Sequence, residues 1–218
     1  MGVSERKKRE KLKRANDIID AAERVFFKNG FEKATMDDIA AEAELSKGTL
    51  YLYFDTKESL YAEIGIRGND ILYNISVKAF ELSEKGMDKL IDLGRVYYEY
   101  YKNYRDYFDA MNHQYSSSCD VVEKELGVSK EKEQGNGSRV EKDAFTLVID
   151  AVEAGISDGS IRKDADPVVS ALLAWAELNG VIWLLRSREG VINDRWGIDG
   201  EDIMDTFFEN TRKSLTPQ

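Results

Sequence analysis

The chain has 218 residues, enough to bury a core without help from a metal or a disulfide. It has one cysteine, Cys119, only two prolines, and no signal-peptide pattern at its N-terminus, so we expect an all-α protein in a reducing cytoplasm. Its formal net charge of −10 argues against a protein that is basic throughout, although the charge is distributed unevenly.

Basic side chains gather at the N-terminus. Residues 1–60 hold 12 basic and 12 acidic side chains, so the rest of the chain carries the whole negative charge. Within the first fourteen residues only two acids accompany the seven basic residues, a composition that suits a phosphate-contacting arm or a solvated terminus without a partner. The basic residues are Arg6, Lys7, Lys8, Arg9, Lys11, Lys13 and Arg14.

Apolar periodicity and capping residues predict about nine helices. Asn29-Gly30 supplies a left-handed stop for the first helix. Thr35 with Asp38 three residues later resembles a capping box for the second, and Ser46 can cap the third. The expected helices span approximately residues 12–29, 36–43, 47–52, 57–84, 87–103, 105–115, 139–154, 167–187 and 201–215. Residues 116–137 are polar and predict a mobile connection with one short helical turn at 121–126.

The second and third helices make a helix-turn-helix if the third is presented outward. Lys47, Thr49 and Tyr51 lie on a side of that helix too polar for a core, whereas Leu50 points inward. Such a helix fits the DNA major groove, and Gly48 leaves room for close approach.

Two further residues are candidate phosphate ligands. The hydroxyl of Tyr53 can donate to a phosphate oxygen, as can that of Tyr51. Lys57 begins the fourth helix, where its charge opposes the helix dipole, so we expect an anion beside it rather than a structural role.

The segment from Ile18 to Leu60 resembles the DNA-binding domain of the tetracycline-repressor (TetR) family. The resemblance departs from the family pattern at Glu44, where glycine is common, and at Asp55. The matching elements are Ala22, Phe26, Gly30-Phe31, Thr35, Ile39-Ala40, Ser46-Lys47-Gly48-Thr49-Leu50-Tyr51, Tyr53-Phe54, Lys57-Glu58 and Leu60.

The resemblance implies roles for these residues in DNA binding. Thr35, Tyr53 and Lys57 would hold phosphates, and the segment Lys47, Gly48, Thr49 and Tyr51 would face the major groove. Ser46 would contact DNA or only cap its helix. Residues 1–56 would form the DNA-binding domain, and residues 57–218 a helical effector-binding and dimerisation domain. The expected function is a ligand-responsive repressor whose fourth helix conveys effector binding to the DNA-binding domain.

Residues 168–185 are apolar on nearly every side, with fourteen Ala, Val, Leu, Ile or Trp among eighteen. We expect this eighth helix to pack in its own subunit on one side and on a second subunit on the other. Polar interruptions such as Glu177 make a membrane span a poorer interpretation. The resemblance likewise implies a homodimer through the last two helices, bound to an inverted-repeat operator on double-stranded DNA. The ninth helix would contribute Ile203, Met204, Phe207 and Phe208.

An aromatic face on the fifth and sixth helices predicts either an effector pocket or an ordinary core. Buried tyrosines need hydrogen-bond partners, which a wet cavity supplies. The expected effector is aromatic or otherwise apolar with a few polar groups, because no basic cluster suits a polyanion. The candidate lining residues are Tyr97, Tyr101, Tyr104, Phe108, Trp175 and Asn179.

An all-α enzyme is the main alternative of another class. A carboxylate-bridged metal bundle needs Glu-x-x-His pairs, but Ala110 stands three residues before the only histidine, His113. We therefore expect no catalytic residue, metal or cofactor. An effector-independent regulator or a protein-interaction module on the same fold remains open.

Overall fold

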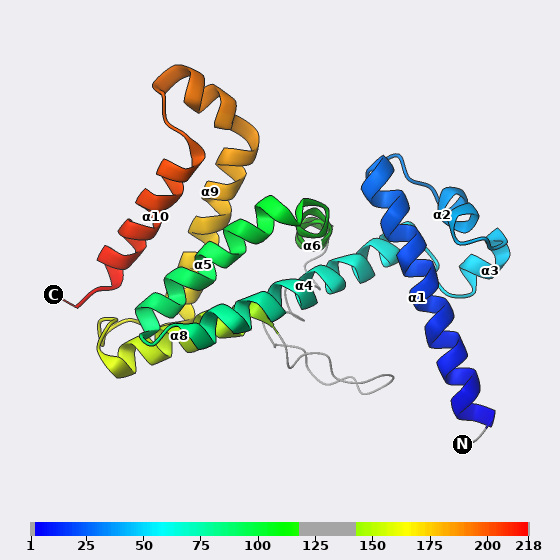
Figure 1. Cartoon of the computed structure of the whole chain (residues 1–218), viewed down its shortest axis with the longest axis horizontal. Helices are drawn as coiled ribbons and strands as arrows, with labels where there is room; N and C mark the ends of the chain where they lie inside the picture. The colour runs from blue at the N-terminus through cyan, green and yellow to red at the C-terminus, as the bar shows by residue number, and fades with distance from the viewer. Residues whose placement is uncertain (1–2, 118–142, 218) are drawn as a thin grey trace. The chain divides into compact units, whose positions relative to one another are not determined.

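The computed structural model describes residues 3–117 and 143–217, which form nine helices and no strand (Figure 1). The all-α prediction is confirmed. Cys119, the expected turn at 121–126 and most of the expected polar connection lie outside the described residues. The helices are α1 (Val3–Asn29), α2 (Met36–Glu42), α3 (Lys47–Tyr51), α4 (Lys57–Leu82), α5 (Gly86–Asn103), α6 (Arg105–Ser117), α8 (Ala144–Asp158), α9 (Pro167–Trp196) and α10 (Gly200–Leu215).

The described residues form two compact units. The first, here called the head, comprises residues 3–68 together with α6. The second, the body, comprises residues 69–104 and 143–217. Helix α4 begins in the head and continues into the body, and α6 groups with the N-terminal helices although it follows α5 in the chain.

The head is built around one apolar cluster from α1, α2, α3, the start of α4 and one residue of α6. The apolar positions that recur along α1 are the ones it buries, as helical periodicity requires. The cluster contains Ile18, Ile19, Ala22, Val25, Phe26, Ala34, Ile39, Ala40, Leu50, Leu60, Tyr61, Ile64 and Ala110.

Helix α1 begins earlier than predicted. It starts at Val3 rather than near residue 12, so the basic N-terminal segment is helical and is not an extended arm. Lysine, arginine and glutamate are good helix formers, and no glycine or proline interrupts the segment. Arg6 also pairs with Glu10 one turn later, at 3.4 Å.

In the body, α5 and α8 cross at two glycines. A Cβ on Gly86 would collide with the backbone of Gly155, so the two helices approach as closely as backbones allow. The end of α8 also caps α5: the Asp158 carboxylate accepts the Gly86 N–H at 2.7 Å, and the Ser160 hydroxyl oxygen accepts the Met87 N–H at 3.1 Å. Hydrogen bonds from the Ser160 side chain and then from the backbone N–H groups of Gly86 and Ser160 lower the pKa of Asp158.

Two helix boundaries differ from those predicted. Helix α8 starts after Asp143, whose carboxylate caps it, and runs to Asp158 rather than to residue 154 because Gly159 supplies the left-handed stop at φ 77°. Helix α9 runs to Trp196 rather than to residue 187. Its polar last turns carry no stop before Gly197, which adopts φ 66°.

Candidate nucleic-acid interface and effector site

Reciprocal caps fix the two helices of the helix-turn-helix. The Thr35 hydroxyl accepts the Asp38 N–H at 3.1 Å, and the Asp38 carboxylate accepts the Thr35 N–H at 3.0 Å, which completes the predicted capping box of α2. Ser46 caps α3 by accepting the Thr49 N–H at 3.2 Å. Its hydroxyl also pairs with that of Thr49 at 2.8 Å, so capping alone accounts for Ser46.

The turn between α2 and α3 keeps the geometry of a glycine turn without the glycine. Among the described residues, Glu44 is the one non-glycine residue with positive φ, at 54°. Left-handed backbone costs an L-residue about 1 kcal/mol. The substitution noted in the sequence therefore strains the turn but does not change its course.

Helix α3 presents the side that the sequence predicted. Leu50 is fully buried and anchors the helix in the head cluster. Lys47, Gly48 and Tyr51 are exposed, whereas Thr49 is half-buried. A Cβ on Gly48 would meet almost nothing, so its surface is open to a ligand backbone.

Lys47 spans the two helices of the motif. Its ammonium lies 2.7 Å from the carboxylate of Asp37 on α2, and this hydrogen bond raises the pKa of Lys47. Both side chains are exposed, so the pair adds little stability and leaves the ammonium accessible beside α3.

Lys57 has a structural role that the sequence did not predict. Its ammonium donates to the carbonyl oxygen of Phe31 at 3.0 Å and lies within 3.5 Å of the carbonyls of Glu32 and Ala34. It also lies 4.4 Å from the centre of the Phe31 ring. The half-buried lysine thus ties the start of α4 to the loop after α1, and the argument that only an anion explains it was wrong.

Thr35 and Tyr53 occupy different surroundings. Thr35 is exposed at the start of α2, whereas Tyr53 is half-buried and packs its ring against the head cluster. Thr56, rather than Asp55, caps α4 by accepting the Ser59 N–H at 3.1 Å.

A polar network joins α1, α4 and α6 within the head, and sequence reasoning missed it. The guanidinium of Arg67 on α4 lies 2.7 Å from the Asp20 carboxylate and 3.1 Å from that of Glu23, both on α1. Tyr107 of α6 donates to Glu23 at 2.8 Å. Burial, followed by this hydrogen bond, raises the pKa of Tyr107 to about 12. The signal in the sequence was the three-residue spacing of Asp20 and Glu23, which places both carboxylates on one face of α1.

The predicted effector residues do not all lie in one unit. Tyr97 on α5 donates to the side-chain oxygen of Asn179 on α9 at 3.0 Å, and the Asn179 amide donates to the Trp175 carbonyl. Tyr101 is buried near them on α5. Phe108 is buried in the head, on α6.

The aromatic side chains predicted to line a cavity contact other groups of the protein. The Tyr97 hydroxyl has a protein partner and does not require a wet pocket. Tyr104 is 40% exposed and stacks on Tyr100 with ring centres 5.4 Å apart. The half-buried Trp175 ring meets Phe145 of α8 edge-on.

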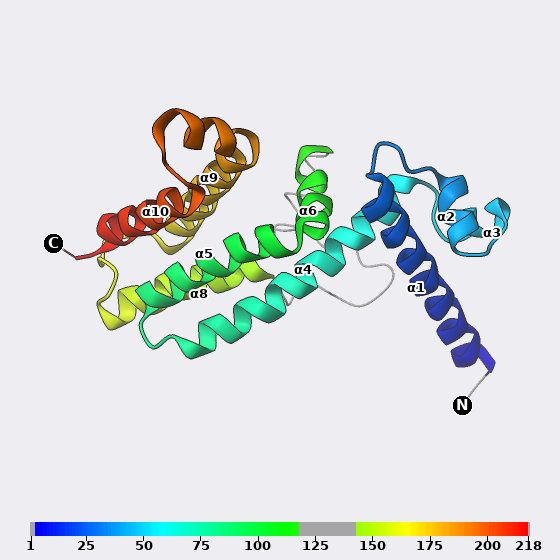
Figure 2. The same cartoon turned by 45° about the horizontal axis from the view of Figure 1, so that its top comes forward.

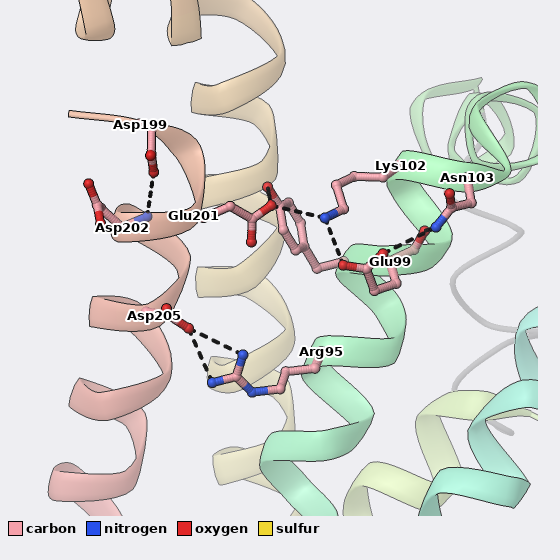
Figure 3. Close-up of polar contacts among 9 residues, drawn as sticks. Arg95, Glu99, Lys102, Asn103, Asp199, Glu201, Asp202 and Asp205 are labelled. Carbon is pink, nitrogen blue, oxygen red and sulfur yellow. Dashed lines mark hydrogen bonds and ion pairs between the residues drawn. The ribbon is translucent and has the colours of Figure 1, made fainter. Parts of the chain in front are cut away.

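Ionic contacts fasten α10 along α5 (Figure 3). Lys102 lies 2.9 Å from the Glu201 carboxylate, and Arg95 lies 3.2 Å from that of Asp205. A third pair, Arg212 with Asp88, lies at 2.8 Å. Hydrogen bonds from Lys102 to Glu99 and Glu201 raise its pKa.

The apolar surface of α9 remains largely exposed in a single chain. A stripe at helical spacing carries Val169, Leu173, Trp183 and Val191, which are 52, 56, 67 and 55% exposed. By length and composition alone, α9 is the one described helix that also qualifies as a membrane span. On α10, Met204 and Phe208 are buried within their own subunit, contrary to their expected place in a dimer interface, and the Phe208 ring packs closely against Gly94 of α5.

Comparison with known proteins identifies the head. Residues 18–64 match the sequence profile of the family described as "Bacterial regulatory proteins, tetR family". The helix-turn-helix of the head is therefore of the TetR type. The matched segment runs from the first buried residue of α1 to Ile64 on α4, so it covers the whole helix-turn-helix.

Similarity to known proteins also extends beyond the helix-turn-helix. It is similar to the transcriptional repressor KstR2 of Rhodococcus jostii, at 27% identity over 78% of this chain and 77% of that one. It is 35% identical to the uncharacterised regulator YfiR of Bacillus subtilis over 43% of this chain, which spans about half (52%) of that relative. FadR of Bacillus subtilis, solved with stearoyl-CoA, shares the fold at a TM-score of 0.65 and 17% identity, covering 91% of this chain and 98% of that one.

Proposed function

We propose that this regulator is a ligand-responsive repressor that binds an inverted-repeat operator and releases it when a small molecule binds the body. The exposed side of α3 carries this proposal. The buried Leu50 anchors α3 in the head cluster. The opposite side of α3 has the size and chemistry to contact base edges in the major groove, and it carries Lys47, Gly48, Thr49 and Tyr51. Thr35, Tyr53 and Lys57 would steady the helix by contacting phosphates.

Within that division, Lys57 acts in two ways. Its carbonyl contacts hold the loop that precedes α2, and its remaining exposed surface would meet the DNA backbone. Ser46 would act on DNA only through the cap that orients Thr49.

The exposed stripe on α9 supports a homodimer. Between its large residues the stripe carries Ala176 and Gly180, both exposed, and a Cβ on Gly180 would meet nothing within 4 Å. Small residues at the centre of an apolar stripe allow two helices to approach closely across a two-fold axis. The half-sites of the operator would then lie roughly 34–36 Å apart, one DNA turn.

The proposed effector is apolar or aromatic with few polar groups. Tyr97, Tyr101, Tyr104, Trp175 and Asn179 of the body remain the proposed contacts, whereas Phe108, predicted with them, lies in the head. Stearoyl-CoA, named with the FadR structure, is a natural first compound to test. Its long apolar chain fits the proposal, whereas its phosphates do not.

Effector binding would reach the DNA through α4 and α6. Both helices grip α1 through Glu23, which accepts from Tyr107 and pairs with Arg67. A displacement of either helix would therefore move α1, against which the helix-turn-helix packs. The two recognition helices of a dimer would then no longer match successive major grooves.

A second candidate is an effector-independent regulator. The Tyr97–Asn179 hydrogen bond favours it, because the tyrosine hydroxyl has a hydrogen-bond partner without a ligand.

An enzyme is not proposed, because the relatives are named as regulators. Among the described residues, no group of three His, Cys, Asp or Glu side chains could bind a metal. We place the protein in the cytoplasm, with residues 1–56 binding DNA and residues 57–218 binding effector and partner subunit.

Selection of bound duplexes from a random pool tests the proposal. The wild-type protein should enrich an inverted repeat, and Thr49→Ala should change the preferred bases. A chain that enriches no sequence at low salt would contradict DNA reading. Release of the selected duplex is then measured with stearoyl-CoA and with uncharged apolar compounds. Failure of all of them to release DNA would favour the effector-independent candidate.

A further inference from the structure

The N-terminal end of α1 is a basic helix that projects from the head. Residues 5–14 are exposed, and the first buried residue of α1 is Ile18. Figures 1 and 2 both show this end of α1 extending beyond α2 and α3. No packing within the head explains its seven basic side chains.

One side of the projection continues the buried stripe of α1. Lys7, Lys11 and Arg14 precede Ile18 by eleven, seven and four residues, and the stripe continues to Ala22 and Val25. Residues at this spacing share one face of a helix. Ile18, Ala22 and Val25 pack in the cluster that contains Ile39 of α2 and Leu50 of α3. The three basic residues therefore lie on the side of α1 that faces the helix-turn-helix.

The opposite side has a different charge balance. Arg6, Arg9 and Lys13 precede the acids Asp17 and Asp20 on that side, and Arg6 already pairs with Glu10. By contrast, Lys7, Lys11 and Arg14 form no ion pair within residues 3–117 and 143–217. The three basic side chains on the α3 side are thus not neutralised by a carboxylate of the described residues.

The length of the projection sets its reach. Eleven residues of helix rise about 16 Å from Ile18 to Lys7. At 3.4 Å per base pair, this corresponds to about five base pairs along a duplex. The helical form matters, because it holds the three charges in one line.

We propose that Lys7, Lys11 and Arg14 form a rigid phosphate-binding stripe that grips the DNA backbone beyond the base pairs contacted by α3. The inference rests on the proposed DNA binding by α3, since the stripe shares its side of the head. Its partner is double-stranded DNA, whose regularly spaced phosphates match a line of cations on a straight helix. The stripe adds affinity and salt dependence but no base preference.

The test compares two triple variants on a 40-base-pair duplex selected from a random pool by the wild-type protein. Lys7→Gln/Lys11→Gln/Arg14→Gln removes the stripe, and Arg6→Gln/Arg9→Gln/Lys13→Gln removes equal charge from the opposite side. Glutamine keeps a good helix propensity, and circular dichroism checks that α1 stays helical. Ethylation interference maps the phosphates that each protein needs, and binding is titrated against salt.

The stripe variant should lose one group of phosphate contacts per half-site, while the preferred bases stay the same. With six cations removed from a dimer, its plot of log affinity against log salt should flatten by about 5. The control should keep the phosphate pattern and lose clearly less slope.

Several outcomes overturn the proposal. Equal losses in both variants would mean that net charge alone acts, and an unchanged phosphate map would mean that the stripe does not touch DNA. Loss of binding to phosphatidylglycerol vesicles with an unchanged DNA footprint would assign the stripe to membranes. A wild-type protein that selects no duplex would instead contradict DNA binding by α3, which separates the two failures.

Discussion

The head and the body differ in how their polar side chains are bonded and how completely their apolar side chains are buried. In the head, the polar residues around α3 cap helices or bind backbone carbonyls, and the apolar residues of α1 to α4 meet in one cluster. In the body, hydrogen bonds join α5 to the end of α8, and ion pairs join α5 to α10. Helix α9 nevertheless leaves the apolar side chains of Leu173 and Trp183 exposed. The apolar cluster of the head is formed by residues of a single chain, whereas the body has an exposed apolar surface that suits a second copy of the chain.

This difference explains why the head is the easier unit to interpret. Its determinants are local: caps three residues apart and a helical repeat of apolar side chains. The body depends on helices far apart in the chain, such as α5 with α10. The family profile accordingly covers residues 18–64, while likeness in the body is carried mainly by the fold.

The largest effect is expected from charging the exposed stripe of the body. Leu173→Glu/Trp183→Glu should convert the dimer to a 24.8-kDa monomer in sedimentation and weaken binding to the selected operator by about 100-fold or more, since two apolar anchors would be lost. Leu82→Glu, at an even more exposed apolar residue on α4, is the control and should stay dimeric. A double variant that remains dimeric would place the interface elsewhere.

The close crossing in the body should be nearly as sensitive. Gly86→Ala forces a methyl group into the backbone of α8 and should lower the free energy of unfolding by about 3 kcal/mol. Gly190→Ala on α9, where a Cβ meets nothing, should be neutral or slightly stabilising. Urea titration of both measures the difference. Equal stabilities would mean that α5 and α8 can separate freely.

Within the head, substitution of Lys57 should mainly affect stability, whereas substitution of Lys47 should mainly affect DNA affinity. Lys57→Met breaks hydrogen bonds from a charged group to carbonyls and should cost about 2 kcal/mol of stability. Lys47→Met breaks only an exposed ion pair, so stability should stay close to that of the wild type while operator affinity falls. Thermal unfolding and DNA titration are measured on both. A Lys57 variant with wild-type stability would refute its structural role.

The smallest expected effect has the opposite sign. Glu44→Gly relieves the left-handed residue in the turn and should stabilise the head by about 0.5–1 kcal/mol. Ala41→Gly, at an exposed site within α2, adds the same backbone freedom without relieving strain and should destabilise by about 1 kcal/mol. Two changes of the same sign would show that the turn is not strained.

Local sequence signals predicted most element boundaries and failed where no nearby residue determines one. The capping box of Thr35 and Asp38 and the Ser46 cap were both predicted and are present. The predicted start of α1 and end of α9 were wrong, because both segments are rich in charged side chains, although Val191 and Ile192 continue the apolar repeat of α9. Helix propensity and a distant glycine set those ends.

The sequence by itself determined the α-helical class, the helix-turn-helix and the outward side of α3, because helical periodicity and caps act within a few residues of one another. Only the tertiary structure decided that Lys57 serves three carbonyls from the preceding loop and that Tyr97 finds Asn179. It also decided that Met204 and Phe208 face their own subunit. Such contacts join residues that are 23 to more than 100 positions apart, and their partners follow from how the helices cross rather than from any local pattern.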